Sequence, residues 1–163
     1  MIAASRAELA LALTGLYDDY GAAIDDDFAR WPDYFTEDAV YRVVARENYA
    51  RGLLWPTMSC EGRGMMLDRV NALRDTTLYA PRQMRHFASA IRVLEDLPDG
   101  YRVRANFLVA ESLTESASRV FAVGRSYDTI VRVAADGGER LLFRERTCVY
   151  DGDLIQSSLV YPL

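Results

Sequence analysis

The stretch YRVRANFLVAE, residues 101–111, decides the fold class that this sequence predicts. Apolar residues occupy its odd positions from 103 to 109, whereas Arg102, Arg104 and Asn106 fall between them. Successive side chains of a β-strand point to opposite faces of the sheet, so this alternation predicts a strand with one buried face. Strand signals also cover residues 86–97, 119–133, 141–150 and 154–160. The second half of the chain is therefore expected to form an antiparallel meander.

The first half of the chain predicts helices. Ser5 with Glu8 three residues later is typical of a capping box, and apolar residues then follow every three or four positions as far as Ile24. We expect this helix to end at the acidic run of residues 25–27, which is most simply a solvated helix end. The other elements predicted before residue 81 are a short helix at 28–35, a short strand at 40–44, an extended loop at 47–59 and a third helix at 64–75.

Helices that precede an antiparallel meander indicate an α+β fold. Several of the predicted strands are long, and long strands with native twist favour a strongly curved sheet. We expect a cone-like antiparallel sheet whose concave face is covered by the N-terminal helices, with a pocket between sheet and helices. A chain of 163 residues favours a single domain, here residues 1–163.

The composition excludes several classes of partner. Lys and Arg total 19 and Asp and Glu total 24, so the formal net charge is −5. A nucleic-acid-binding surface needs a net basic face, so we expect no nucleic acid partner. No apolar run approaches the ~18 residues of a membrane span, and no signal-peptide core follows the N-terminus. We therefore expect no membrane partner. Cys60 and Cys148 stand far apart and outside any CxxC motif, so we expect free thiols and a cytoplasmic location.

Metal ligands are scarce in this sequence. His86 is the only histidine of the chain. A Rieske cluster needs two His and two Cys ligands, a mononuclear oxygenase iron commonly takes two His and one carboxylate, and typical catalytic zinc sites use several His. No Asp/Glu constellation suggests a magnesium site. We therefore expect no metal and no cofactor in this chain.

Several short motifs stand in a characteristic order along nearly the whole chain. They are WPDYFTED (31–38) followed by YRV (41–43), EN (47–48) with Gly52, MLDRV (66–70) with ALR (72–74), YAPRQMRH (79–86) and LVYPL (159–163). Each motif is weak alone, but residues 67–74 followed by 81–86 are fairly specific as a pair. In this order the motifs resemble the small (beta) subunits of Rieske-type aromatic-ring-hydroxylating dioxygenases, of terephthalate, anthranilate and salicylate type.

The resemblance implies a nuclear-transport-factor-2-like cone fold and a structural, non-catalytic role. In that family the small subunit packs with an oxygenase large (alpha) subunit, commonly as three of each chain, α3β3. The large subunit holds the Rieske 2Fe-2S cluster, the mononuclear iron and the aromatic substrate. The resemblance therefore implies an oligomeric protein of aromatic-compound catabolism, which forms a homotrimer or another homo-oligomer when alone.

Two other functions stay open from the sequence. Stand-alone isomerases, dehydratases and cyclases of the cone fold use an Asp or a His with Tyr donors in an apolar cavity. The candidates here are Asp38, Tyr41 and His86, the last as a general acid or base oriented by a carboxylate. The simpler interpretation makes Asp38 a cap or turn residue, Tyr41 a core residue and His86 a hydrogen-bonded structural residue. A ligand-binding protein of the same fold is the third reading.

Other residues are candidates for an interface with another subunit. They are Trp55, Arg82, Arg85, Tyr161 and Leu163. Two guanidinium groups can hold a neighbour's carboxylates in fixed geometry, although pairing within the chain, with Asp68 or Glu47 for example, is the simpler interpretation. The tryptophan lies in a weakly periodic stretch, and exposure of residues 53–56 would form an apolar interface patch.

Overall fold

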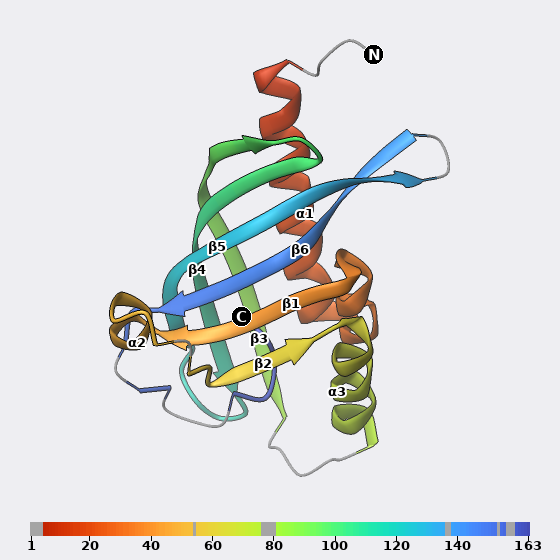
Figure 1. The fold of residues 1–163 in the computed structure, drawn as a ribbon. Coiled ribbons are helices and arrows are strands. Elements are labelled where there is room, and N and C mark those ends of the chain that lie inside the picture. The colour runs from red at the N-terminus through yellow and green to blue at the C-terminus, as the bar shows by residue number, and fades with distance from the viewer. Residues whose placement is uncertain (1–4, 54, 76–80, 136–137, 153, 156–158) are drawn as a thin grey trace.

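The structure is a computed structural model and describes residues 5–53, 55–75, 81–135, 138–152, 154–155 and 159–163. Figure 1 shows the arrangement of its helices and strands. They are α1 (Arg6–Asp26), the 3-10 helix η1 (Phe28–Tyr34), β1 (Phe35–Ala45), α2 (Arg46–Ala50), β2 (Met58–Glu61), α3 (Arg63–Asp75), β3 (Arg82–Leu97), β4 (Gly100–Leu113), β5 (Arg119–Ala135) and β6 (Gly138–Tyr150). Leu54, Tyr79 and Ala80, which belong to the motifs and the patch predicted above, lie outside the described residues.

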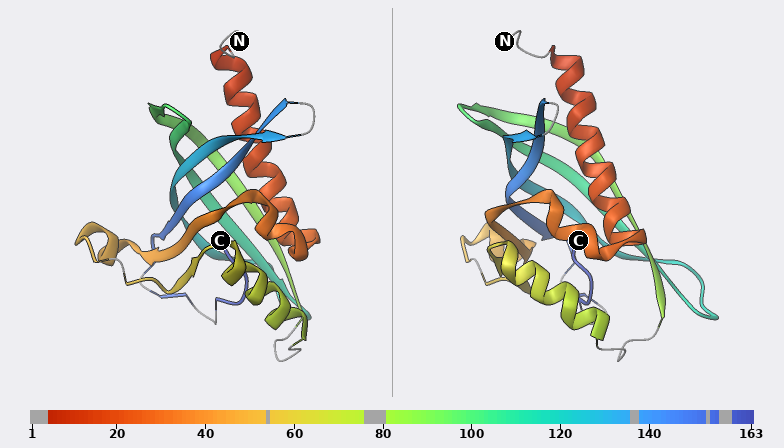
Figure 2. Two further views of the ribbon diagram at one scale, coloured as in Figure 1. Left: turned by 45° about the vertical axis from the view of Figure 1, so that its right-hand side comes forward. Right: turned by 90° about the vertical axis from the view of Figure 1, so that its right-hand side faces the viewer.

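One curved sheet of six strands, in the order β2-β1-β6-β5-β4-β3, forms the body of the molecule. Strands β3 to β6 make the antiparallel meander, and β1 joins it by pairing parallel to β6. Helix α1 crosses the concave side of the sheet and packs against β3 and β6 (Figure 2), while α3 contacts β1 and β2. The predicted α+β fold, a strongly curved sheet with N-terminal helices in its concave face, is confirmed.

The capping box predicted for α1 is present. Ser5 Oγ accepts a hydrogen bond from the Glu8 backbone N–H at 3.2 Å, and Glu8 Oε2 accepts one from the Ser5 backbone N–H at 2.6 Å. The helix ends where expected, but its last turn is not wholly solvated. Gly21 lies so close to β3 that a Cβ added there would be 3.3 Å from His86 Cβ. This approach leaves the Asp25 side chain only 7% exposed against His86, so the predicted solvated run is wrong at Asp25.

The region between η1 and α3 contains more regular structure than the sequence predicts. Strand β1 extends beyond the predicted residues 40–44 at both ends, and residues 47–59 contain most of α2 and the start of β2 instead of an extended loop. The pairing of β2 along β1, from Val40↔Glu61 to Val43↔Met58, accounts for the difference. A strand this short is stabilised by its neighbour in the sheet, which local periodicity does not reveal.

The strand predicted at residues 154–160 is not formed by its described part, residues 154–155 and 159–160. Strand β6, which precedes it, is already paired with β1 on one side and with β5 on the other. A further strand has no free edge beside β6, so residues 159–163 follow another path and end in the buried interior. Side chains, rather than a neighbouring strand, satisfy the backbone of this segment.

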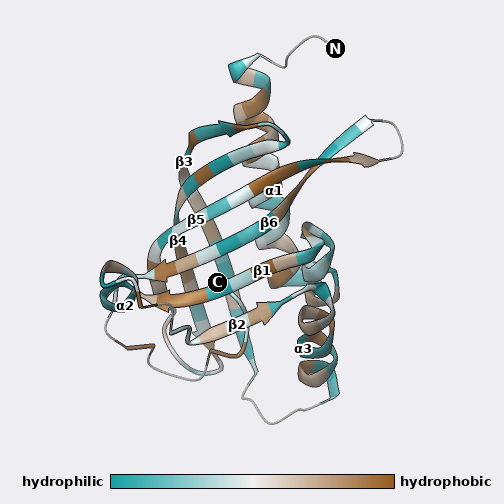
Figure 3. Cartoon of the chain, viewed as in Figure 1, coloured by the Kyte–Doolittle hydropathy of each residue, from teal (hydrophilic) through white to brown (hydrophobic). Residues whose placement is uncertain are grey.

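Aromatic side chains fill the space between α1, η1 and the sheet. Trp31, Phe35, Tyr41 and Phe143 are 0–1% exposed, and their ring centroids lie 5.4–6.1 Å apart, mostly edge to face. Such pairs add about 0.5–1.5 kcal/mol each beyond the burial of their area. Along the meander, hydrophobic and hydrophilic residues alternate (Figure 3), so one face of each strand joins this core. The interior of the cone-like sheet is therefore largely occupied.

Candidate functional site

A charged pair lies at the centre of the interior. Asp128 on β5 and Arg146 on β6 are cross-strand neighbours, and Arg146 Nη1 donates a hydrogen bond to Asp128 Oδ2 at 3.0 Å. Their side chains are 0% and 3% exposed, respectively. Ser126 Oγ donates to the same carboxylate oxygen at 2.7 Å, and the hydroxyl of Tyr17 on α1 is a further donor to it. One cation and two hydroxyls thus surround a single buried carboxylate oxygen.

Burial sets the protonation of this cluster. It raises the pKa of Asp128 above its ordinary value, and the charge of Arg146 opposes that rise. Burial and the Asp128 carboxylate also raise the pKa of Tyr17 well above its usual range, so this hydroxyl stays a donor. Arg146 lies 4.4 and 4.8 Å from the ring centroids of Tyr20 and Phe143, within cation–π distance. Asp128 Oδ1 and Arg146 Nε have no hydrogen-bond partner among the described residues.

His86 connects the end of α1 with segment 159–163. Its Nδ1 lies 2.6 Å from Asp25 Oδ1, and its backbone N–H donates to Asp25 Oδ2 at 2.9 Å. Its Nε2 lies 3.1 Å from the carbonyl oxygen of Pro162. Both ring nitrogens lie within hydrogen-bonding distance of oxygen atoms of the same chain. The two nitrogens of this imidazole are therefore engaged by groups of its own chain.

Leu163 occupies the interior beside these residues, with 1% of its surface exposed. Its N–H donates to the Tyr41 hydroxyl at 2.7 Å. Its carbonyl oxygen accepts a hydrogen bond from the Tyr20 hydroxyl at 3.0 Å and one from Cys148 Sγ at 3.4 Å. The backbone of this residue is therefore held by side chains of α1, β1 and β6.

Arg69 on α3 holds the other end of segment 159–163. Its Nη2 donates to the carbonyl oxygens of Leu159 and Val160 at 2.7 and 2.6 Å.

Little open space remains beside this segment. The cavity left beside the segment has a volume of about 20 Å³. One water molecule needs about 10–15 Å³ measured in this way, so this cavity is far too small for an aromatic substrate.

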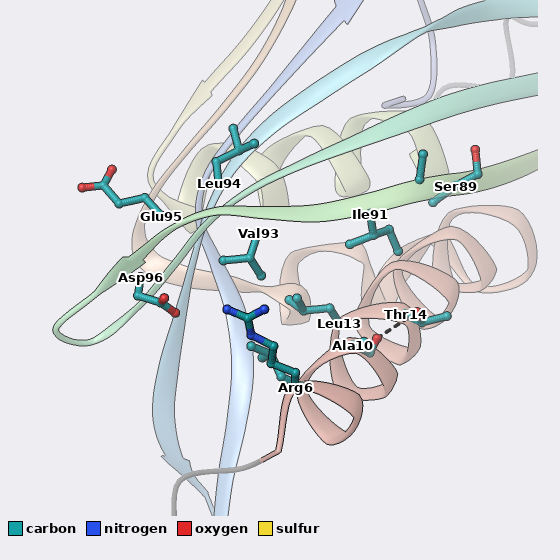
Figure 4. Close-up of a pocket in the computed structure, with 13 residues that line it drawn as sticks. Arg6, Ala10, Leu13, Thr14, Ser89, Ile91, Val93, Leu94, Glu95 and Asp96 are labelled. Atoms are coloured by element: carbon teal, nitrogen blue, oxygen red, sulfur yellow. Dashed lines mark hydrogen bonds between the residues drawn. The ribbon is translucent and has the colours of Figure 1, made fainter.

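A larger pocket lies away from this cluster, between the first half of α1 and the far part of β3 (Figure 4). Its volume is about 640 Å³, and apolar side chains such as Leu13 and Ile91 form part of its walls. A pocket between sheet and helix, as predicted, is thus present. None of the three catalytic candidates, Asp38, Tyr41 and His86, lines it. The pocket therefore gives no support to a catalytic role for these residues.

The face of the sheet turned away from α1 carries exposed apolar side chains. Strand pairing places one row of residues across β3, β4 and β5, and a second row beside it. The rows are Phe87, Leu108 and Val123, and Arg85, Ala110 and Val120. Phe87 and Val120 are each 57% exposed, and Val123 is 45% exposed. We call these six residues the outer-face patch, since contiguous exposed apolar groups mark interaction sites.

The chain is similar to known proteins along most of its length. Residues 22–157 match the family described as ring hydroxylating beta subunit. The chain belongs to this family. The predicted resemblance is confirmed.

Two relatives and one solved structure illustrate the similarity. This beta subunit is 31% identical over 149 residues to the anthranilate 1,2-dioxygenase small subunit of Burkholderia cepacia, covering 91% of this chain and 90% of that protein. It is 30% identical over 149 residues to the terephthalate 1,2-dioxygenase terminal oxygenase component subunit beta 1 of Comamonas sp, covering 88% and 92%. The crystal structure of a beta subunit assigned to an aromatic-ring-hydroxylating dioxygenase of Novosphingobium aromaticivorans matches with a TM-score of 0.83 and 30% identity, covering 98% of this chain and 100% of that chain.

The three catalytic candidates do not converge in this beta subunit. Asp38 is exposed on β1 and accepts a hydrogen bond from Thr36 Oγ1 at 2.9 Å. The buried residues of this part of β1 are the odd-numbered ones, so Asp38 points away from the interior. Tyr41 and His86 do meet one element, because both are hydrogen-bonded to segment 159–163. Asp38 therefore does not lie with Tyr41 and His86 in the interior, and the stand-alone enzyme is not favoured.

Two of the interface candidates are accessible. Trp55 is 71% exposed, as expected. The Arg85 side chain is 54% exposed and belongs to the outer-face patch; its guanidinium lies 3.6 Å from the carboxylate of Asp26. These two side chains are available to another subunit.

The other interface candidates are engaged within the chain. The Arg82 side chain is 11% exposed and pairs with the buried Glu111 at 3.0 Å. This agrees with the expected pairing within the chain, although the partner is neither Asp68 nor Glu47. The ring of Tyr161 packs edge to face on Phe28 at 5.2 Å between centroids. Leu163 is buried in the core of this chain, with 1% of its surface exposed, so its side chain is not accessible to a neighbour in this structure.

Several polar residues of the interior were not identified from the sequence. Asp128 follows the buried even positions 122–126 of β5, and Glu111 follows the buried odd positions of β4. Strand alternation therefore contained a signal for both. Arg146 and Asp25 had none, since their partners depend on the register between strands and on the approach of α1 to β3.

Within the described part of the chain, no group of three or more His, Cys, Asp or Glu is arranged to hold a metal ion. Among the same residues, no helix is both long and apolar enough to cross a membrane. Cys60 and Cys148 are free and buried, as expected.

Proposed function

We propose that this beta subunit is the non-catalytic, structural small subunit of an aromatic-ring-hydroxylating dioxygenase that serves aromatic-compound catabolism. One observation carries the proposal. In a chain of this family, the interior around Tyr41 and His86 is filled by side chains and by segment 159–163, leaving a cavity of about 20 Å³ there, and the larger pocket between α1 and β3 is lined by none of the catalytic candidates. Meanwhile the apolar side chains of the outer-face patch face solvent. The molecule thus exposes apolar surface that a neighbouring subunit can bury, whereas the space beside segment 159–163 is too small for a substrate.

The partner in this proposal is an oxygenase large subunit, which holds the Rieske 2Fe-2S cluster and the mononuclear iron. The number of available ligands supports this division of labour. The single histidine of this chain supplies neither the two His of a Rieske cluster nor the two His of a typical mononuclear iron site. That histidine, His86, is also already bonded to Asp25 and Pro162.

The assembly in this proposal is a cytoplasmic α3β3 complex, and the chain alone forms a homotrimer or another homo-oligomer. The outer-face patch and Trp55 are the contact surfaces that we assign to it. Aromatic and Arg side chains are enriched at the centres of protein interfaces. Phe87 and Arg85 are neighbours of this kind on the outer face of β3, so one ring could enter an apolar pocket while one guanidinium holds a carboxylate.

The test is to express the chain alone and together with an oxygenase large subunit encoded beside it, and to measure both masses by light scattering. We expect a complex of three plus three chains. Iron and acid-labile sulfide should be present in the complex and absent from the separately purified small subunit. A stable small subunit that never binds the large one would contradict the proposal, as would iron in the small subunit.

A further inference from the structure

Three arginines gather on the outer face of the sheet, beside the outer-face patch. Strand pairing sets Arg92 of β3 directly opposite Arg104 of β4. Arg125 of β5 lies opposite Asn106, which is two positions along β4 from Arg104. Residues that face each other across antiparallel strands point to the same side of the sheet, with their Cβ atoms about 4.5–5.5 Å apart. We call Arg92, Arg104 and Arg125 the arginine cluster.

The charge of this cluster is not neutralised within the chain. Eleven of the 19 arginines form an ion pair with Asp or Glu in the part of the chain that the structure describes. Among the same residues, the three arginines of the cluster have no ion pair and no side-chain hydrogen bond. The acidic side chains of the neighbouring row, Glu95 and Glu145, bind Arg102 and the Thr129 hydroxyl instead, each at 3.2 Å.

This arrangement is unfavourable in the isolated subunit. Arg92 and Arg104 are like charges directly opposite each other, and such pairs destabilise a sheet. A carboxylate between two guanidinium groups removes the repulsion and forms charge-assisted, often bidentate hydrogen bonds with them. Arg92 and Arg125 are exposed and Arg104 is partly buried, so a partner can reach them. The cluster therefore suits an anion that the chain itself does not supply.

Apolar and aromatic side chains border the cluster. Along β5, Val123 of the outer-face patch lies two positions before Arg125, so both side chains point to the same face. Two positions after Arg125 comes Tyr127, which lies opposite Arg104 on β4. Its ring stacks on that of Tyr49, with 5.1 Å between centroids. The outer-face patch and the arginine cluster thus form one continuous surface, apolar on one side and cationic beside it.

This combination matches an acidic protein surface better than a nucleic acid or a membrane. Protein interfaces combine apolar and aromatic side chains with arginine, whereas nucleic acids and anionic membranes attract proteins through extended basic surfaces. The chain carries a net charge of −5, which repels a large polyanion from the molecule as a whole. Three arginines can pair with two or three carboxylates that stand close together.

We propose that the arginine cluster binds a group of two or three neighbouring carboxylates on the large subunit, next to the apolar contact of the outer-face patch. This inference rests on the proposed function, because it takes the large subunit as the partner. It adds the chemistry of the partner's surface, namely acidic side chains about 5 Å apart beside an apolar one. Because opposite charges steer encounter, the cluster acts mainly on the association rate and its salt dependence.

The first experiment measures association of the separately purified large and small subunits by biolayer interferometry at several salt concentrations. The cluster variant replaces all three arginines, as Arg92→Gln/Arg104→Gln/Arg125→Gln. The control removes the same charge at three exposed arginines elsewhere, as Arg6→Gln/Arg30→Gln/Arg74→Gln. We expect the cluster variant to associate about tenfold more slowly at low salt, and the difference to shrink as salt screens the charges. The control should stay near the wild-type rate, and the melting temperature of the cluster variant should not fall.

The outcomes separate this inference from the proposed function. If the wild type binds the large subunit and the cluster variant matches it in rate and salt dependence, the inference fails and the proposed function stands. If the wild type does not bind at all, both fail. Equal slowing of the cluster variant and the control would also overturn the inference, because net charge alone would then explain the effect.

The second experiment identifies the anion. Carboxylates of the large subunit are labelled with carbodiimide and glycine ethyl ester, in the free subunit and in the complex, and located by mass spectrometry. We expect the wild-type complex to protect a group of neighbouring carboxylates that remains labelled in the complex with the cluster variant. Protection of the same carboxylates in both complexes would overturn the proposal. So would binding of the wild-type small subunit to phosphatidylglycerol vesicles or double-stranded DNA that the cluster variant loses.

Discussion

The interior and the outer-face patch differ in how completely their side chains are satisfied. In the interior, Asp128 is paired with Arg146, His86 with Asp25, and Leu163 with side chains of three elements. On the outer-face patch, Phe87 and Val120 leave more than half of their surface in water. The interior pairs most of its polar groups within the chain, with Asp128 Oδ1 and Arg146 Nε as exceptions among the described residues, whereas the patch leaves apolar area in water. The difference teaches that the contacts that stabilise the fold lie in the first region, and the proposed function assigns subunit association to the second.

The largest effect on stability is expected at the buried ion pair. Arg146→Met leaves the Asp128 charge buried without its cation and should lower the free energy of unfolding by about 3–5 kcal/mol. The double variant Arg146→Met/Asp128→Leu removes both charges and should recover most of that loss. Urea unfolding of the three proteins, followed by circular dichroism, separates these cases. A double variant as unstable as the single one would show that an unpaired charge was not the cause.

A large effect is also expected where segment 159–163 enters the interior. Leu163→Ala removes a fully buried side chain and should cost about 2–5 kcal/mol, the usual range for such a truncation. Leu154→Ala is the matched control, because Leu154 is 84% exposed and surface substitutions usually change stability by less than ~0.5 kcal/mol. Denaturant midpoints of the two variants provide the measurement. Equal, small effects would place residue 163 outside the core in solution.

A pH-dependent effect should follow from Asp128. Because burial raises the pKa of this carboxyl, the folded protein holds its proton more tightly than the unfolded chain does. The contribution of Asp128 to stability is therefore greatest at low pH and is lost as the pH rises from the ordinary value of 3.8 through the raised one. The unfolding free energy of the wild type, minus that of Arg146→Met/Asp128→Leu, should fall over this interval. A rise would mean that Arg146, not burial, dominates the pKa.

The smallest effect on stability is expected at the rim of the outer-face patch. Arg85 and Asp26 are 54% and 71% exposed and 3.6 Å apart, and exposed ion pairs contribute roughly 0–1 kcal/mol. Arg85→Ala should therefore leave the melting temperature nearly unchanged while weakening large-subunit binding and its salt dependence. Arg74→Ala, at another exposed ion pair, is the control. Binding curves at two salt concentrations that are identical for both variants would remove Arg85 from the interface.

Much of the fold could be predicted from local patterns. The capping box at Ser5 and Glu8 and the spacing up to Ile24 located α1, and strand alternation located the four strands of the meander. Local patterns failed where a long-range partner decides the structure. Residues 58–61 become β2 only beside β1. The described residues of the range 154–160, which are 154–155 and 159–160, form no strand because β6 already has two neighbours.

Less of the candidate site could be predicted, for the same physical reason. Residue type and pattern pointed to Tyr41 and His86, and both do lie in the interior. Their partners, however, are carbonyl oxygens of Pro162 and Leu163 and the carboxylate of Asp25. Such contacts join residues some 60 to 120 positions apart, and no periodicity records them. Exposure of Trp55 was predicted because its stretch fits neither a helix nor a strand.

The central claim is that the interior holds the fold and the outer-face patch holds the partner. The most direct test is to co-express a tagged large subunit with the double variant Phe87→Ser/Val123→Ser, and to record co-purification and the melting temperature of the variant. Leu11→Ser, at a side chain that is 75% exposed on α1, serves as the control. The account predicts a wild-type melting temperature, loss of co-purification for the double variant and normal co-purification for the control. A double variant that co-purifies at the wild-type ratio would contradict it.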